Sequence, residues 1–268
     1  MIGLWARYYR AQIKLSLAVQ FQYRVAMAIW MLDIVLSPMI YLVVWTTVAQ
    51  SSGGTVNGFT PSDFAAYYTV LMIVQHITQI WHMWEYEYLI REGGMAQRLL
   101  RPLHPINEDI SQNISYKILM LMVLIPAVLL FVLLFRPAFH TPLWSALAFI
   151  PAVLLGAALA FVIGWTLAMA AFWTTRIVAI NSLYFTAMLF FAGYLAPLDL
   201  LPRFMQMIAG VLPFRWMMSF PVELALGRVA PEAVLGGFAA QALWIVFGVL
   251  VLRRVWKAAV RRFSSVGG

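Results

Sequence analysis

Six apolar segments, each close to the ~20 residues that cross a bilayer as a helix, divide this chain of 268 residues. They cover residues 25–48, 64–89, 110–134, 143–172, 177–195 and 233–252. Hydrophobic residues make up 63% of the chain and charged residues 10%, so too few polar side chains remain to cover a soluble domain. The sequence therefore predicts an all-α membrane protein, with one transmembrane domain over residues 1–268 and six transmembrane helices.

Basic side chains orient the six segments. If the N-terminus lies in the cytoplasm, all but four of the 18 lysines and arginines fall on the cytoplasmic side. Since cytoplasmic loops are enriched in these residues, we expect cytoplasmic N- and C-termini and a basic cytoplasmic tail over residues 253–268. The net charge of +8 then faces the anionic inner surface of the lipid bilayer, and we expect no nucleic-acid partner. The four exceptions are Arg136, Arg203, Arg215 and Arg228.

Residues 1–23 predict an amphipathic helix that lies in the inner membrane interface. Arg7, Arg10 and Lys14 share one face of this helix, and aromatic side chains lie away from them. The segment lacks the apolar core and the cleavage site of a signal peptide. Its role as a topology anchor or as a moving part stays open.

The second segment carries a polar stripe, because Gln75, Gln79 and His82 recur at helical spacing. Polar side chains at this depth face other helices or a watery cavity. The stripe either lines a substrate path or a moving seam, or it holds helices together by hydrogen bonds. His76 and His82 project from different faces of a helix, so we expect no metal site.

Asp33 is the only charged residue of the first segment. A carboxylate inside a membrane span is a candidate functional residue. The alternative, which we favour, is a structural carboxylate that bonds to polar groups of neighbouring helices such as Asn181.

Small residues recur every four positions in the fourth segment, and they allow another helix to approach closely. We favour a partner helix within the chain over one from a second copy. The small residues are Ala152, Gly156, Ala160, Gly164 and Ala168.

The inner connection over residues 85–110 reads EYEYLIREGGMAQRLLRPLHPINEDI. Glycine adopts the left-handed conformation of a helix cap, so Gly93 and Gly94 end one helix. A short helix of about two turns follows and ends at Pro102. Such a helix could press into a groove on a cytoplasmic partner, or it could be a solvated surface helix anchored by basic residues.

On this short helix we expect an apolar side made of Met95, Leu99 and Leu100. Arg98 and Arg101 are expected to be exposed. The acidic residues and His104 around it lack metal-ligand or nucleophile–base spacing, so we interpret them as a solvated loop and predict no enzyme. Those acidic residues are Glu85, Glu87, Glu92, Glu108 and Asp109. The candidate contact residues are Gly93, Gly94, Met95, Gln97, Arg98, Leu99, Leu100, Arg101 and Pro102.

Prolines interrupt the apolar stretch between the fifth and sixth segments. Its two helical pieces, residues 203–212 and 214–226, are each too short to cross a bilayer. We expect residues 197–226 to form a re-entrant helical hairpin that enters from the outer face. Its candidate residues are Pro197, Asp199, Pro202, Arg203, Pro213, Phe214, Arg215, Pro221 and Glu223, of which Asp199, Arg203, Arg215 and Glu223 are expected at the outer rim.

Two motifs carry a family resemblance that extends over essentially the whole chain. GYLAPLDLLP followed by LPFRWMMSFPVELALG resembles the closing signature of type-2 ATP-binding-cassette (ABC) exporter permeases. EGGMAQRLLRPLHP is similar to the inner loop of one branch of that family, with its Gly-x-x-x-x-x-Leu-x-Arg-Pro pattern. Members of the family include permeases for lipid-linked polysaccharides, drugs, antibiotics and related amphiphiles.

The resemblance implies a working unit of two permease chains, identical or related, and two ABC ATPase subunits in a bacterial cell (inner) membrane. It implies that residues 93–102 are a coupling helix seated on the ATPase, and that residues 197–226 form an outer gate. The first and fifth spans would line the path of an amphipathic or lipid-like substrate. This chain would hold no cofactor, and ATP and Mg would bind to the partner ATPase.

The chain contains no Gly-Lys dipeptide, because Lys14, Lys117 and Lys257 follow Ile, Tyr and Trp. A phosphate-binding P-loop is therefore excluded, and ATP hydrolysis must come from a partner if this is an ABC protein. An ion-gradient-driven secondary transporter is the alternative. That class predicts paired intramembrane charges and an internal repeat, whereas here Asp33 stands alone and no convincing repeat is visible.

Overall fold

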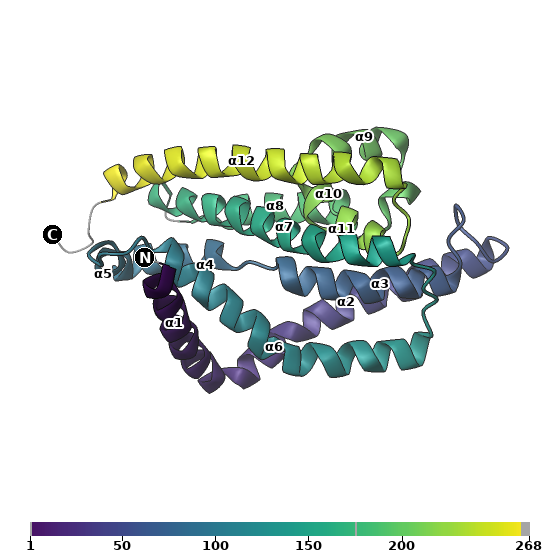
Figure 1. Cartoon of the computed structure of the whole chain (residues 1–268), viewed down its shortest axis with the longest axis horizontal. Helices are drawn as coiled ribbons and strands as arrows, with labels where there is room; N and C mark the ends of the chain where they lie inside the picture. The colour runs from purple at the N-terminus through teal and green to yellow at the C-terminus, as the bar shows by residue number, and fades with distance from the viewer. Residues whose placement is uncertain (1, 175, 264–268) are drawn as a thin grey trace.

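The computed structural model describes the backbone of residues 2–174 and 176–263, and these residues form helices and no strand (Figure 1). The last five residues of the predicted basic tail, 264–268, lie outside the described residues. The helices are α1 (Ile2–Gln22), α2 (Arg24–Ser51), α3 (Pro61–Thr78), α4 (His82–Arg91), α5 (Gly94–Leu99), α6 (Ile106–Phe135), α7 (Leu143–Ala168), α8 (Val178–Phe191), α9 (Arg203–Val211), α10 (Pro213–Met217), α11 (Ser219–Ala225) and α12 (Pro231–Arg262).

Four helices within the described residues are long and apolar enough to cross a membrane. They fall on the first, third, fourth and sixth predicted segments, and the fifth contains α8, an apolar helix of 14 residues. The prediction of an all-helical membrane protein is therefore confirmed, while the count of six spans and the orientation stay predictions. The four helices cover Leu32–Ser51, Ile106–Phe135, Leu143–Phe172 and Pro231–Arg262.

The second predicted span, residues 64–89, is not one continuous helix but two, α3 and α4. Gln79 between them has an extended backbone, with φ −62° and ψ 139°. Its carbonyl accepts a hydrogen bond from Nδ2 of Asn113 on α6 at 3.2 Å. The ring of Trp81 packs on Tyr116, also on α6, with centroids 4.7 Å apart. Partners on α6 thus satisfy and cover a break that neither proline nor glycine marks.

Helix α7 packs against α3, α4, α11 and α12, and Figure 1 shows it running alongside α12. A methyl group on Gly156 would collide with the backbone carbonyl of Met217 in α10, and one on Gly164 would collide with the side chain of Ile80. Glycine is needed at both positions for this close approach. The small-residue row therefore packs within the chain, as predicted.

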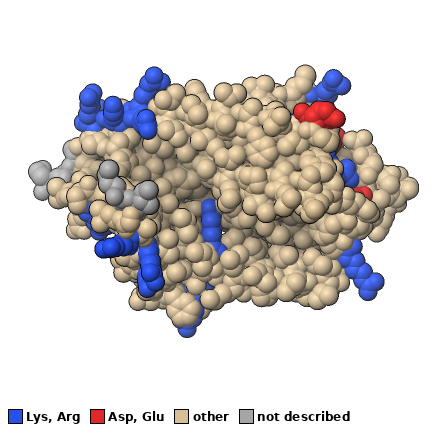
Figure 2. All heavy atoms as spheres, viewed as in Figure 1, with Lys and Arg blue, Asp and Glu red and all other residues tan. Residues whose placement is uncertain are grey.

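Helix α1 crosses the end of the bundle at an angle and packs against α6 (Figure 1). Tyr9 OH donates a hydrogen bond to Asn107 Oδ1 at 2.7 Å, and Gln20 Nε2 donates to the carbonyl of Gln112 at 3.0 Å. Several basic side chains gather at the end of the molecule where α1, α5 and the end of α12 lie, whereas the middle of the face in view is almost uncharged (Figure 2). The basic face of α1, formed by Arg7, Arg10 and Lys14, is exposed.

Candidate functional site

A buried ion-pair network holds the short helix α5 against the rest of the molecule. Arg98 on α5 is only 7% exposed. Its Nη1 lies 2.8 Å from Asp109 Oδ1, and its Nη2 lies 3.0 Å from Glu85 Oε1 and 3.7 Å from Glu108 Oε1. Burial by itself would lower the pKa of Arg98, but attraction to these three carboxylates outweighs it and raises the pKa. The guanidinium therefore stays charged.

Asp109, at the start of α6, joins four helices at one carboxylate. It is fully buried. One oxygen binds Arg98 of α5, while the other accepts hydrogen bonds from Tyr86 OH of α4 at 2.6 Å and from Trp165 Nε1 of α7 at 2.8 Å. Charge-assisted bonds of this kind are among the strong ones in proteins. A displacement of α5 must therefore move α4, α6 and α7 or break this network.

Two expectations about this segment are corrected. Arg98 is not exposed, and the acidic residues Glu85 and Asp109 are not a solvated loop, because they neutralise Arg98 in the interior. Their positions, 13 residues before Arg98 and 11 after it, reveal the network only once the chain is known to fold back on itself.

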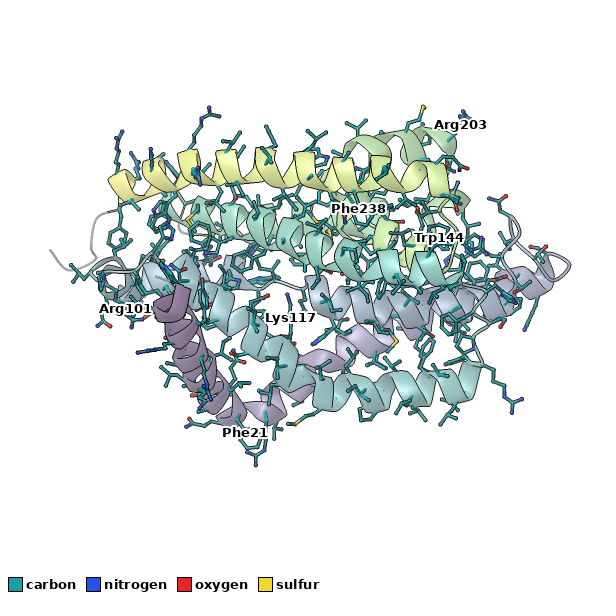
Figure 3. The ribbon with its side chains drawn as sticks, in the orientation of Figure 1. Phe21, Arg101, Lys117, Trp144, Arg203 and Phe238 are labelled. Carbon is teal, nitrogen blue, oxygen red and sulfur yellow. The ribbon has the colours of Figure 1, made fainter. Side chains whose placement is uncertain are left out.

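The solvent-exposed surface of α5 also differs from the predicted apolar side of Met95, Leu99 and Leu100. Met95 is fully buried and Leu99 is half-buried against the core, so neither forms an outward apolar side. Leu100 is 86% exposed. Arg101 is exposed as well, at the end of the molecule (Figure 3), with its Nη1 2.6 Å from Glu108 Oε2. The remaining candidates divide in the same way, with Gln97 and Pro102 exposed and Gly93 and Gly94 half-buried.

Gly93 provides the turn between α4 and α5, as predicted. Its φ of +75° lies in the left-handed region that glycine adopts without strain. This turn allows Glu85 and Arg98 to meet across two successive helices.

His82, Glu85 and Asp109 also place a ring nitrogen and carboxylate oxygens within 4.8 Å of one another. This donor set does not fit a metal ion, because both oxygens of Asp109 are bonded to other groups and the Arg98 charge lies beside them. The ring of His82 is fully buried between Trp81, at 5.2 Å, and Phe161, at 5.4 Å. Glu85 and Asp109 belong to the ion-pair network, whereas neither ring nitrogen of His82 has a hydrogen-bond partner among the described residues.

A pocket of about 410 Å³ lies between α2, α3, α4 and α8. It brings together three of the five candidate pathway residues, Asp33, Gln75 and Gln79. Its lining combines polar, aromatic and aliphatic side chains, which suits a ligand with both polar and apolar parts. Its lining consists of Asp33, Ser37, Tyr41, Gln75, Thr78, Gln79, Ile80, Trp84, Tyr184, Phe185, Met188, Leu189 and Tyr194.

The proposed bond between Asp33 and Asn181 is absent from the described residues. Asp33 is exposed on α2 and accepts a hydrogen bond from Ser37 Oγ of the same helix at 2.8 Å. Asn181 is buried on α8, and its side-chain atoms have no hydrogen-bond partner within the part of the chain that the structure describes. Neither Asn181 nor His82 lines the pocket.

The predicted hairpin consists of α9, α10 and α11 and lies at the end of the molecule opposite α5 (Figure 1). Arg203 points outward there (Figure 3), and Asp199 is exposed. Arg215 and Glu223 instead pair with each other at 3.1 Å, so they fasten α10 to α11 rather than mark a rim. Pro202 is exposed, whereas Pro197, Pro213 and Pro221 are buried and Phe214 is half-buried.

The hairpin is tied to the membrane helices by its preceding loop. Tyr67 OH donates a hydrogen bond to the carbonyl of Gly193 at 2.7 Å. Trp45 Nε1 and Tyr68 OH donate to the carbonyl of Leu195 at 2.8 Å and 3.0 Å. These bonds link the hairpin to α2 and α3, two of the helices that form the pocket.

A protein-family model described as ABC-2 family transporter protein matches residues 35–267. The match includes α5, the hairpin and every residue that lines the pocket except Asp33, and it leaves out α1 and the first turns of α2. A comparison with curated proteins found no match.

Proposed function

Because this chain belongs to the ABC-2 family of transporter proteins, we propose that it is the permease subunit of an ABC exporter. Family membership makes it a multi-pass membrane protein that works with an ABC ATPase. The proposal adds the direction, which is export, and the energy source, which is ATP hydrolysed by the separate subunit. Two permease chains, identical or related, and two ATPases would form the transporter in a bacterial inner membrane.

Helix α4 is the observation that carries the proposal, since it connects the α5 network to the pocket. Trp84 lines the pocket, and the next residue, Glu85, binds Arg98. The break at Gln79 separates α4 from α3, so α4 can tilt without bending a continuous helix. A push on α5 from a closing ATPase would therefore reach the pocket through α4, a helix of ten residues.

We propose that the pocket is one half of the substrate path. Asp33 and Ser37 of α2 line it, and a second permease facing it would complete a larger cavity. Tyr41, Trp84 and Tyr184 offer aromatic surface to an amphipathic or lipid-like substrate. The hairpin would act as the outer gate, because its anchoring loop is bonded to α2 and α3.

Cross-linking tests the coupling assignment directly, since the chain has no cysteine. A photo-cross-linker attached at Leu100→Cys should capture the co-expressed ABC ATPase subunit. The matched site, Arg203→Cys at the opposite end of the molecule, should not capture it. Equal capture at both sites, or capture only at Arg203→Cys, would contradict the proposal.

A further inference from the structure

A second pocket, of about 520 Å³, lies beneath α1, and the transport proposal does not use it. Its walls come from α1, the beginning of α2, the α3–α4 break, α4 and the first turns of α6. Gln79 in the break lines both pockets, so the two chambers share one side chain.

Three residues that line this second pocket keep buried oxygen atoms without a hydrogen-bond partner in the described residues. These atoms are Oε1 of Gln20, Oε1 of Gln79 and Oε2 of Glu85. Gln20 already donates through Nε2 to the carbonyl of Gln112, and Glu85 already accepts from Arg98 through Oε1. Buried acceptors that lack a donor are costly, so a bound molecule that brings donors is favoured.

The charge and the apolar wall of the pocket indicate which class of molecule it can bind. Glu85 and Glu108 line it, and none of its described lining residues is basic; Lys117 on α6 is not among them. Leu15, Trp30 and Trp81 form an apolar and aromatic wall. Such a wall can pack against an acyl or alkyl chain, and the tryptophan rings can also bind a cation over their faces.

We infer that this pocket binds an amphiphile with a primary ammonium head. The head donates hydrogen bonds to the oxygens of Gln20, Gln79 and Glu85, and the chain lies along the aromatic wall. The inference goes beyond the transport proposal, because binding needs neither the ATPase nor export. An aminolipid of the bilayer and an exported amphiphilic amine share this chemistry.

Direct binding tests the site. Tritiated dodecylamine is added to the purified chain in dodecyl maltoside, and binding is read by scintillation proximity against empty micelles. Dodecyltrimethylammonium carries the same charge without N–H donors, so we expect it to compete about tenfold or more weakly than unlabelled dodecylamine. Gln20→Met removes one acceptor and should weaken dodecylamine binding by about tenfold. Gln75→Met removes an equally unpartnered glutamine oxygen from the first pocket only, and should leave binding unchanged.

Equal competition by dodecylamine and dodecyltrimethylammonium would overturn the inference. This comparison uses the native chain, so it does not depend on the folding of a variant. Loss of binding in Gln75→Met but not in Gln20→Met would overturn it too, because the amine would then occupy the first pocket. Phosphatidylethanolamine added to the micelles distinguishes the sources. If phosphatidylethanolamine competes with dodecylamine, the natural ligand is a bilayer lipid. If it does not compete, the natural ligand is another amphiphilic amine. Either result supports an amine-binding site in this pocket.

Discussion

Arg98 is the residue on which the position of α5 depends. It is a single buried cation among three carboxylates, and all three come from the helices on either side of it along the chain, Glu85 from α4 and Glu108 and Asp109 from α6. Removal of one partner from a buried ion pair leaves the other charge without compensation in a poorly solvated interior.

We predict that Arg98→Met destabilises the protein by about 3–5 kcal/mol, because Asp109 and Glu85 lose their counter-charge. Thermal unfolding in detergent, followed by fluorescence-detected size exclusion, measures the effect. The control is Arg101→Met, where the arginine side chain is 56% exposed and its ion pair with Glu108 is screened by solvent. Asp109→Asn should partly rescue Arg98→Met. Equal losses for the two arginine variants would contradict a special role for Arg98.

Leu99 and Leu100 are neighbours with different environments, and we predict different consequences for them. Leu100→Asp should leave thermal stability unchanged, because this side chain is 86% exposed, but should weaken ATPase binding at least about tenfold. Leu99→Asp should lower stability, because Leu99 packs against the core. Co-purification of the ATPase and the unfolding temperature are the two readouts. Stable binding of the ATPase to Leu100→Asp would place the contact elsewhere.

At the scale of the element, the lengths of the apolar segments and the positions of glycine and proline predicted most of the helices. Residues close in sequence determine where such helices begin. Thr60, for example, forms with Asp63 the capping box that starts α3. The break at Gln79 had no such signal, because its stabilising partners, Asn113 and Tyr116, lie on α6. Long-range contacts also explain why the residues of the polar stripe end up in different places. Gln75 and Gln79 line the pocket, and His82 lies outside it.

Helix α7 offers a test of close packing. We predict that Gly156→Ala destabilises the protein by about 1–3 kcal/mol, since the added methyl group collides with the backbone carbonyl of Met217, which cannot rotate away. Gly236→Ala in α12 is the matched control, because nothing lies within 4 Å of its added carbon. Its stability should match or slightly exceed that of the native chain, since alanine favours a helix more than glycine does. A Gly156→Ala variant as stable as Gly236→Ala would mean that α7 and α10 are further apart in solution.

At the scale of the whole molecule, α5 lies at one end and the hairpin at the other, with the pocket between them. Arg101 marks the first end and Arg203 the second (Figure 3). The sequence predicted this order from charge and proline positions. It could not predict that α4 carries both a pocket residue, Trp84, and a network residue, Glu85, because that depends on how α4 packs after the break.

This arrangement predicts that nucleotide changes the pocket only when an ATPase is present. Ser37→Cys, in the pocket wall, should react with a membrane-impermeant maleimide at a rate that changes at least about fivefold when ATP and vanadate trap the complex. The same variant without the ATPase should react at one rate with or without ATP, because the chain has no P-loop to bind it. Ser52→Cys, exposed beyond the end of α2, should react equally in every state. An effect of ATP on the isolated chain would contradict the division between a permease that moves and an ATPase that drives it.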